Sequence, residues 1–148
     1  MPHINEDMDY TVEVFIVNNG RVLLRKHDKY KIWLSVGGHI EPGEDPNEAA
    51  IREVREEVGL QIRLMGTTRT GKIYTDLIPP AFLNRHSIND KHEHVTLVYL
   101  ATSETDIINQ GEVEVSEECK WWTREEIERS EEIRDHIKRY SLAALDKA

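Results

Sequence analysis

The chain has 148 residues and a formal net charge of −9 at pH 7, a length that suits one domain of ordinary size with a real core. The excess of negative charge argues against a nucleic-acid groove, which relies on Lys and Arg to neutralise phosphates. The single cysteine, Cys119, excludes an intrachain disulfide, and we expect a cytoplasmic protein with no secretory signal and no membrane-spanning segment.

The N-terminal part of the sequence predicts a β-hairpin followed by a further strand. Val12 to Val17 and Arg21 to Lys26 are apolar-rich runs, and Asn18-Asn19-Gly20 between them tolerates positive φ. Trp33 to Val36 predicts a strand that ends at Gly37-Gly38. The missing side chains there permit a sharp turn or the close approach of a ligand.

The next segment predicts a helix with a defined start and end. Asp45-Pro46-Asn47-Glu48 combines an N-cap acid, a proline suited to the first helical position and the glutamate of a capping box. Gly59 is expected to end the helix. Between them, Ala50, Val54 and Val58 recur at four-residue intervals and predict an apolar stripe that packs on a sheet.

Three further strands are predicted after this helix, at Gln61 to Thr68, Lys72 to Leu77 and Val95 to Ala101. Ile78-Pro79-Pro80 is expected to start an irregular segment that runs to about His92. Because binding residues often lie on such loops, this segment is a candidate for substrate specificity.

The C-terminal part predicts one more strand, roughly Glu112 to Trp121, and then a helical region that opens with a second capping box at Thr123-Arg124-Glu125-Glu126. The apolar residues that give this region one buried side are Ile133, Ile137, Tyr140 and Leu145. These elements predict an α/β fold with one mixed β-sheet flanked by helices, in a single domain over residues 1–148.

Three carboxylates are crowded near the end of the predicted helix. Glu53, Glu56 and Glu57 are spaced i, i+3 and i+4, so they share one helix face, and like charges at this spacing cost roughly 0.2–0.5 kcal/mol per pair. They also lie toward the negative end of the helix dipole. A solvated acidic face relieved by Arg52 and Arg55 is the structural alternative. A bound divalent cation would remove both penalties, and oxygen ligands suit Mg²⁺, so we favour a metal site.

The same segment matches a known family pattern. The Nudix box requires Gly, five residues, Glu, seven residues, and then Arg-Glu-aliphatic-any-Glu-Glu-any-Gly-aliphatic. Here it is filled by Gly38, Glu44, Arg52, Glu53, Val54, Glu56, Glu57, Gly59 and Leu60. The chain therefore resembles the MutT-like Nudix hydrolases. The resemblance implies the Nudix α/β/α sandwich and a hydrolase of nucleoside diphosphates linked to another moiety. Val36, where many relatives have Pro, is a small departure.

The resemblance also implies a role for the acidic side chains of the box. Glu53, Glu56 and Glu57 are expected to bind Mg²⁺, with Mn²⁺ as an alternative, and the carbonyl of Gly38 is a further expected ligand. The implied mechanism is metal-assisted hydrolysis, in which the cation bridges the phosphates and lowers the pKa of the attacking water.

The other polar residues of the box receive implied roles as well. Arg52 resembles the family arginine that orients a catalytic carboxylate, so the expected catalytic set is Glu53, Arg52 and Glu56. Glu44 is expected to support the loop and helix. The general base is expected to be Glu53, with Glu93 further along the chain as the alternative.

Substrate contacts are expected from four residues outside the box. Phe82 and Arg85 lie in the predicted irregular segment, where they could stack on a base or hold a phosphate. Arg25 ends a strand that could face the site, and Glu93 lies beside the segment. For each of them a surface or packing role is an equal alternative.

Three histidines, His86, His92 and His94, lie near Glu93 and are residue types that bind Zn²⁺. No cysteine accompanies them, and residues near a strand entry are commonly exposed. We therefore favour substrate contact or simple solvation over a zinc site.

The expected partner is a small-molecule nucleotide, with no nucleic acid and no membrane, for a protein that is a monomer or homodimer. A (deoxy)nucleoside triphosphate cleaved to the monophosphate and pyrophosphate is the leading substrate. ADP-ribose, another nucleotide sugar or a dinucleoside polyphosphate is the nearest alternative. A diphosphate isomerase is disfavoured because Cys119 lies late in the chain. A non-catalytic nucleotide sensor is disfavoured because every box carboxylate is present.

Overall fold

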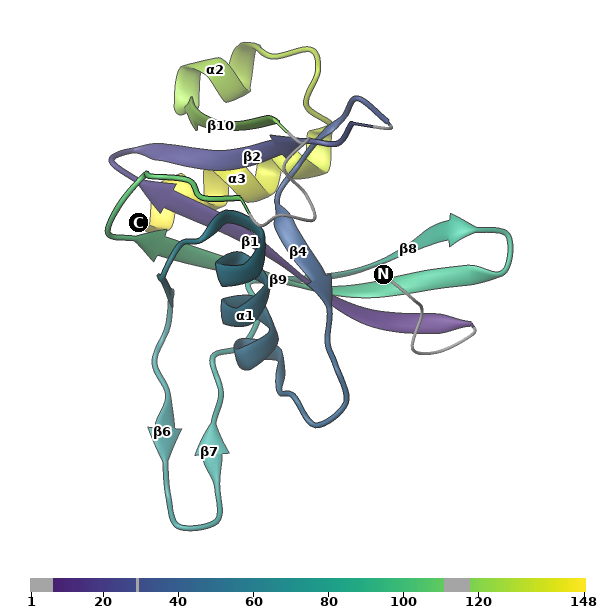
Figure 1. The fold of residues 1–148 in the computed structure, drawn as a ribbon, viewed down its shortest axis with the longest axis vertical. Helices are drawn as coiled ribbons and strands as arrows, with labels where there is room; N and C mark the ends of the chain where they lie inside the picture. Colours follow the sequence, from purple (N-terminus) through teal and green to yellow (C-terminus); the bar gives the residue numbers. More distant parts are fainter. Residues whose placement is uncertain (1–6, 29, 111–117) are drawn as a thin grey trace.

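A computed structural model describes residues 7–28, 30–110 and 118–148 and shows a mixed sheet with helices on both faces (Figure 1). The strands of the main sheet are β1 (Met8–Asn18), β2 (Arg21–Lys26), β3 (Trp33–Leu34), β4 (Val36–His39), β5 (Ile62–Leu64), β8 (Phe82–Asn89), β9 (His92–Ser103) and β10 (Glu118–Thr123). The helices of the described residues are α1 (Pro46–Val58), α2 (Arg124–Arg129) and α3 (Asp135–Lys147).

The sheet is built around the parallel pair β1 and β9. Its order is β10-β2-β1-β9-β5, with β3 on β2, β4 on β1 and β8 on β9. The predicted hairpin is confirmed, because β1 pairs antiparallel with β2 from Asn18↔Arg21 onward. Asn19 and Gly20 join the two strands with φ values of 49° and 71°, the backbone that a two-residue hairpin turn requires.

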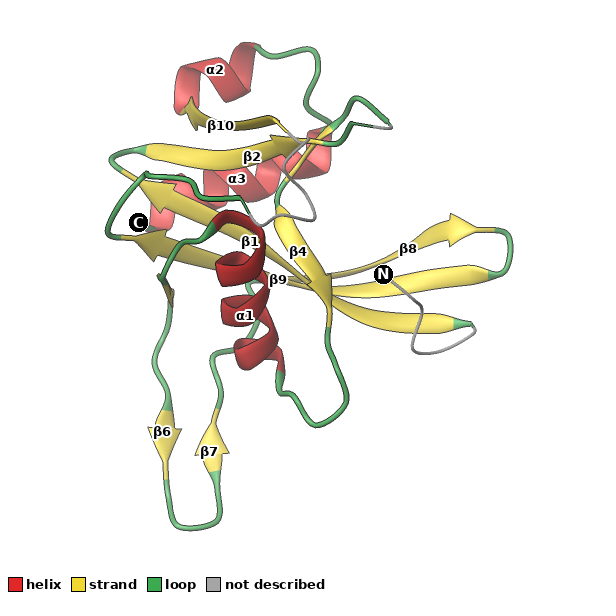
Figure 2. Ribbon diagram, viewed as in Figure 1, coloured by secondary structure: helices red, strands yellow, loops and turns green. Residues whose placement is uncertain are grey.

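Alternate residues of β1 supply two core layers. Val12, Val14 and Ile16 pack on the face covered by α1, whereas Phe15 and Val17 pack on the face covered by α2 and α3. Figure 2 shows α1 in front of the sheet and α3 behind it. The prediction of a mixed sheet flanked by helices is therefore confirmed.

Helix α1 has the ends that its sequence predicts. Asp45 accepts from the backbone N–H of Glu48 at 2.9 Å, and the Glu48 side chain accepts from the Asp45 backbone at 3.0 Å. Gly59 ends the helix in the left-handed conformation, with φ 69°. The predicted apolar stripe of Ala50, Val54 and Val58 is fully buried.

The prediction that the strand from Trp33 ends at a glycine turn is wrong. Gly37 and Gly38 lie inside β4, where they pair with Glu13 and Val12 of β1. A Cβ on Gly37 would come 2.2 Å from the carbonyl oxygen of Val12, so this glycine allows the two backbones to approach closely.

The strand predictions after α1 need larger corrections. The predicted strand from Gln61 to Thr68 is confined to β5, and only Thr75–Asp76 (β7) of the run Lys72 to Leu77 is a strand. β7 pairs with β6 (Arg69–Thr70) in a separate ribbon, labelled in Figure 1, whose Ile73 is fully exposed. Apolar residues here do not mark a buried strand.

The expected irregular segment to His92 is also wrong, because residues 82–89 form β8, which pairs antiparallel with β9. Along β8 only Phe82 and Asn84 are partly covered, and the remaining side chains are exposed. An edge strand that extends beyond the core lacks the alternation of apolar and polar residues by which strands are recognised.

The second capping box is confirmed, since Thr123 accepts from the backbone of Glu126 and Glu126 accepts from the backbone of Thr123. The helical region divides into α2 and α3, and Ile133, Ile137 and Tyr140 are buried. The predicted strand beginning at Glu112 is observed only from Glu118, because residues 112–117 lie outside the described residues. No helix in the described ranges is long and apolar enough to cross a membrane.

Candidate active site

The three carboxylates of α1 have different surroundings although they share one stretch of helix. Glu53 is 2% exposed. The side chain of Glu56 is 56% exposed, and that of Glu57 is 13% exposed. The rotation of the helix thus turns Glu53 toward the sheet and Glu56 toward solvent, with Glu57 between them.

Glu53 packs directly against Gly38 of β4. A Cβ built on Gly38 would come 2.3 Å from Glu53 Oε1, far closer than any two such atoms can approach. Only a glycine at this position leaves space for the carboxylate. The pairing of Gly38 with Val12 in the sheet holds this part of the backbone in place over Glu53.

Arg52 connects the helix to the loop before it. Its Nε and Nη2 donate to the two carboxylate oxygens of Glu44 at 2.6 and 2.9 Å, and Nη2 also donates to the carbonyl of His39 at 3.0 Å. The Arg52 guanidinium holds the pKa of Glu44 below its usual value through this hydrogen bond. The loop between β4 and α1 is thereby fixed to the helix.

The same guanidinium reaches two of the predicted metal ligands. Nη1 of Arg52 donates to Glu53 at 3.0 Å and to Glu56 at 3.2 Å. The pKa of Arg52 is raised, chiefly by the hydrogen bond with Glu44 and further by the bond with Glu53. Arg52 is therefore a permanently charged donor to Glu53.

Arg25 and Glu57 form a second ion pair, between Nη1 and Oε2. Arg25 comes from β2, and its side chain is 5% exposed. The structure thus places this predicted substrate contact on the α1 face, directed at a carboxylate of the box.

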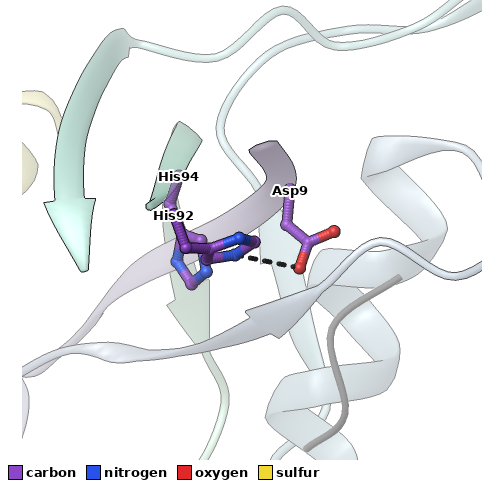
Figure 3. Close-up of side chains that lie close together, drawn as sticks. All are labelled: Asp9, His92 and His94. Carbon is purple, nitrogen blue, oxygen red and sulfur yellow. Dashed lines mark ion pairs between the residues drawn. The ribbon is translucent and has the colours of Figure 1, made fainter. Parts of the chain in front are cut away.

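The three box carboxylates are not gathered around one point among the described residues: Arg52 contacts Glu53 and Glu56, and Arg25 contacts Glu57. Among the described residues, the one group of three whose potential ligand atoms all lie within 4.8 Å is Asp9, His92 and His94 (Figure 3). The box nevertheless fits Mg²⁺: carboxylate oxygens are the ligands that this ion prefers, and Glu53 occupies the space that a side chain on residue 38 would fill.

A cavity of about 560 Å³ lies on the opposite face of the sheet, between β1, β4, β8, β9 and α3. Thr11, Asn84 and Tyr140 are among its lining residues, and the Gly37-Gly38 backbone forms part of its wall. Because Gly38 also contacts Glu53, the cavity and the box carboxylates meet at this one residue.

The lining of the cavity is more basic than the protein as a whole. Arg85, Arg134 and Arg139 contribute to it, whereas Glu13 is the one carboxylate among its lining residues in the described part of the chain. Burial raises the pKa of Glu13. The cavity can therefore accommodate an anionic ligand that the net charge of the chain would repel.

Three histidines of the cavity wall have lowered pKa values, which favour the neutral ring at neutral pH. Burial lowers the pKa of His86 and of His136. The pKa of His94 falls to about 4, because of burial first and of the neighbouring histidines His39, His86 and His92 second. These rings therefore offer nitrogen atoms rather than positive charge.

The other predicted substrate contacts are placed differently from one another. Phe82 packs on Tyr140 at a ring distance of 4.6 Å, in the core layer under α3. Arg85 lines the cavity and donates two hydrogen bonds to Glu93, at 2.7 and 2.8 Å. The Arg85 guanidinium holds the pKa of Glu93 below its usual value.

Of the two expectations for the histidines near Glu93, substrate contact or solvation, simple solvation does not hold for His92 and His94. His92 is 4% exposed, and His94 is half-buried beside the cavity. The cause is the register of the sheet, which directs both side chains to the face shared with Asp9 of the neighbouring strand.

Several residues of the cavity were not identified as site residues from the sequence alone. Arg134, His136 and Arg139 come from α3 and its approach, and no spacing along the chain relates them to β8. A detectable signal did exist in β1, where Asp9, Thr11 and Glu13 are polar at alternate positions of a strand rich in apolar residues.

Comparisons with known proteins agree with this geometry. The family model described as the NUDIX domain matches residues 9–144. The crystal structure of a NUDIX-family hydrolase from Clostridium perfringens superposes with a TM-score of 0.84 at 33% sequence identity, covering 97% of this chain and 98% of that one.

Two curated relatives match this chain over only part of their own length. The m7GpppN-mRNA hydrolase NUDT17 of Xenopus laevis is 32% identical over 104 residues, which are 66% of this chain and 34% of that protein. The "Probable DHNTP pyrophosphohydrolase" of Lactococcus lactis subsp. cremoris is 30% identical over 97 residues, 66% of this chain and 55% of that protein. The chain thus spans about a third to a little over half the length of these two relatives.

Proposed function

Because the chain belongs to the Nudix family, we propose that it is a pyrophosphohydrolase that cleaves the diphosphate linkage of a nucleoside diphosphate joined to another moiety. The proposed substrate is a (deoxy)nucleoside triphosphate, and the products are the monophosphate and pyrophosphate. The observation that carries the proposal is the position of Glu53, buried against Gly38 and held by Arg52.

Glu53, Glu56 and Glu57 are the proposed Mg²⁺ ligands, together with the carbonyl of Gly38. When bound, the cation would neutralise phosphate charge and make a water molecule more acidic. The observed partners of two carboxylates suit this role. Arg52 and Arg25 lie against them, so the buried negative charge is compensated before any cation arrives.

Glu53 is the proposed general base, and Arg52 is the proposed positioning residue. A carboxylate with little exposed surface keeps one orientation, and the donor at 3.0 Å fixes it further. Glu93, the alternative base, accepts hydrogen bonds from Nε and Nη2 of Arg85 with its two carboxylate oxygens, on the exposed part of strands β8 and β9. This pairing favours Glu53.

The nucleoside part of the substrate is proposed to lie in the cavity under α3. A nucleoside in that position would reach Gly38 at the cavity wall, so its phosphates would pass the edge of β4 toward Glu53. Arg134 and Arg139 supply the positive charge that an anionic substrate needs there.

The isomerase alternative is disfavoured by the position of Cys119. Its side chain packs against the core layer on the α1 side, accepts a hydrogen bond from Gln110 at 3.0 Å, and is not among the cavity residues. A thiol in that place cannot meet a ligand in the cavity.

The test is a panel of nucleotides incubated with the full chain and Mg²⁺ or Mn²⁺, with products identified by mass spectrometry. The panel includes canonical and damaged triphosphates, ADP-ribose, dinucleoside polyphosphates, capped RNA and dihydroneopterin triphosphate. Formation of a monophosphate and pyrophosphate from a triphosphate supports the proposal. Cleavage of ADP-ribose alone would show that the substrate is a nucleotide sugar and not a triphosphate. Nucleotide binding without any cleavage would indicate a sensor.

A further inference from the structure

The sheet register brings an aspartate and three histidines together near the start of β1. Asp9 of β1 lies opposite His94 of the parallel strand β9, and His92, two residues earlier on β9, points to the same face. His39 of β4 lies opposite Thr11, which is two residues from Asp9 and therefore also on this face. Three strands thus contribute to one cluster.

The atoms of this cluster lie close enough together to reach one metal ion. Asp9 Oδ2 is 3.3 Å from His92 Nε2 and 3.2 Å from His39 Nε2. One ligand atom from each of Asp9, His92 and His94 lies within 4.8 Å of the others. In a tetrahedral zinc site with bonds of about 2.0–2.1 Å, neighbouring ligand atoms are about 3.3–3.4 Å apart. The Asp9–His92 contact already meets this spacing.

The cluster is also shielded from solvent. Asp9 has no exposed surface, and His92 and His39 are 4% and 7% exposed. A buried carboxylate is costly unless a cation compensates it. Imidazole and carboxylate together suit Zn²⁺ and related transition metals rather than Mg²⁺, which favours an all-oxygen site.

We propose that Asp9, His92 and His94 bind one divalent transition-metal ion of the zinc class, and that His39 holds the Asp9 carboxylate in place from β4. Figure 3 shows the side chains of His92 and His94 beside Asp9 of the neighbouring strand, with the ion pair between His92 and Asp9 as a dashed line. This site is separate from the box carboxylates of α1, since its side chains project from the opposite face of the sheet. It does not depend on the proposed hydrolase activity.

The position of His94 gives the ion an open side. His94 and His39 both line the cavity, so a ligand in the cavity could complete the coordination of the metal. Three protein ligands with a remaining open position are typical of zinc ions that contact a small molecule.

The test is metal binding by the full untagged chain after removal of metal with a chelator. Zn²⁺ is titrated by calorimetry in the presence of excess Mg²⁺, which competes for carboxylate sites, and Co²⁺ is titrated by visible absorption. We expect a single Zn²⁺ per chain, no competition by Mg²⁺, the intense visible bands of four-coordinate Co²⁺, and a higher Tm with Zn²⁺.

His94→Gln is the main variant because His94 is only half-buried and the fold should tolerate the change. Removing a residue that holds a metal ligand in place commonly weakens metal affinity by about 10–100-fold, so we expect this loss for His39→Gln and a larger loss for His94→Gln. His136→Gln is the matched control, because His136 lines the same cavity but lies outside the cluster. Circular dichroism of each metal-free variant verifies folding.

Equal Zn²⁺ affinity of His94→Gln and the unaltered protein would overturn the proposal, as would Zn²⁺ binding that Mg²⁺ abolishes. The absence of any Zn²⁺ binding would assign the cluster to an Asp–His ion pair instead. Because these experiments use metal alone, their outcome is independent of whether any nucleotide is hydrolysed.

Discussion

Glu53 of α1 and Gly38 of β4 are in such close contact that a single methyl group on Gly38 would come 2.3 Å from Glu53 Oε1. Gly38 does not have a positive φ, so the backbone conformation does not require a glycine here. The requirement is space for the carboxylate. This contact joins the glycine that opens the Nudix box to the helix that carries its carboxylates.

Gly38→Ala is therefore expected to displace Glu53 and to lower kcat by about a hundredfold, the loss typical of a catalytic group moved by about 1 Å. The fold should survive because the flexible end of a side chain can move aside. The control is Gly20→Ala in the hairpin turn, which has φ 71° and open space around it. That change should lower the free energy of unfolding by about 1–2 kcal/mol and leave kcat unaltered. Full activity of Gly38→Ala would show that the contact is not functional.

Glu57→Gln should reduce kcat by orders of magnitude, and it should also lower Tm because it removes the charge partner of Arg25, so activity is compared at a temperature where circular dichroism shows the folded chain. The physical reason is that the amide keeps the size of the side chain but removes the negative charge proposed to bind Mg²⁺. Glu125→Gln, an exposed acid of α2, is the matched control. Near-normal turnover by Glu57→Gln would refute its assignment as a ligand.

Arg25→Met should destabilise the protein in the absence of divalent cations. The Arg25 and Glu57 side chains are only 5% and 13% exposed, and removing one partner of a buried pair costs about 3–5 kcal/mol. If Mg²⁺ binds Glu57, it should replace part of the lost charge. Thermal unfolding should then show a larger rise of Tm with Mg²⁺ for the variant than for the unaltered protein. An equal rise of Tm for both proteins would show that Glu57 does not bind the metal.

The helix of the site was predictable because its determinants are local. The capping box at Asp45, the ending at Gly59 and the spacing of the three glutamates all lie within a few turns of one another. The burial of Glu53 was not predictable in this way. It depends on the contact with Gly38, which only the assembled sheet creates.

The cavity and the histidine cluster depend on strand register, which the sequence does not display. Ile78-Pro79-Pro80 predicts a loop where β8 is found, and the mostly exposed side chains of β8 give no alternating pattern to correct this. Its Asn84 and Arg85 could therefore not be placed beside α3. Asp9 and His92 are brought together by the parallel pairing of β1 with β9 across more than half of the chain.

The ion pair of Glu44 with Arg52 should make stability depend on pH in the acidic range. The pKa of Glu44 is lower in the folded protein than in the unfolded chain, so the unfolded chain binds more protons as the pH falls. The stabilisation is thus present above the ordinary pKa of a glutamate and is lost as the pH falls through the lowered value. Urea unfolding across this range should give a flatter profile for Glu44→Gln. Parallel profiles would show that the pair does not contribute.

Glu13→Gln tests whether the cavity under α3 holds the nucleoside. Glu13 is the carboxylate of a wall that is otherwise basic, and its amide replacement keeps the shape of the wall while changing an acceptor of hydrogen bonds into a partial donor. The loss of one hydrogen bond of about 1 kcal/mol should raise KM about fivefold. Because the reacting phosphates are proposed to lie beyond Gly38, kcat should stay within about twofold, the pattern of a contact made equally in the ground and transition states. Glu118→Gln at the exposed start of β10 should alter neither constant. A fall in kcat with constant KM would instead place Glu13 beside the reacting phosphates, and the nucleoside would then have to bind elsewhere.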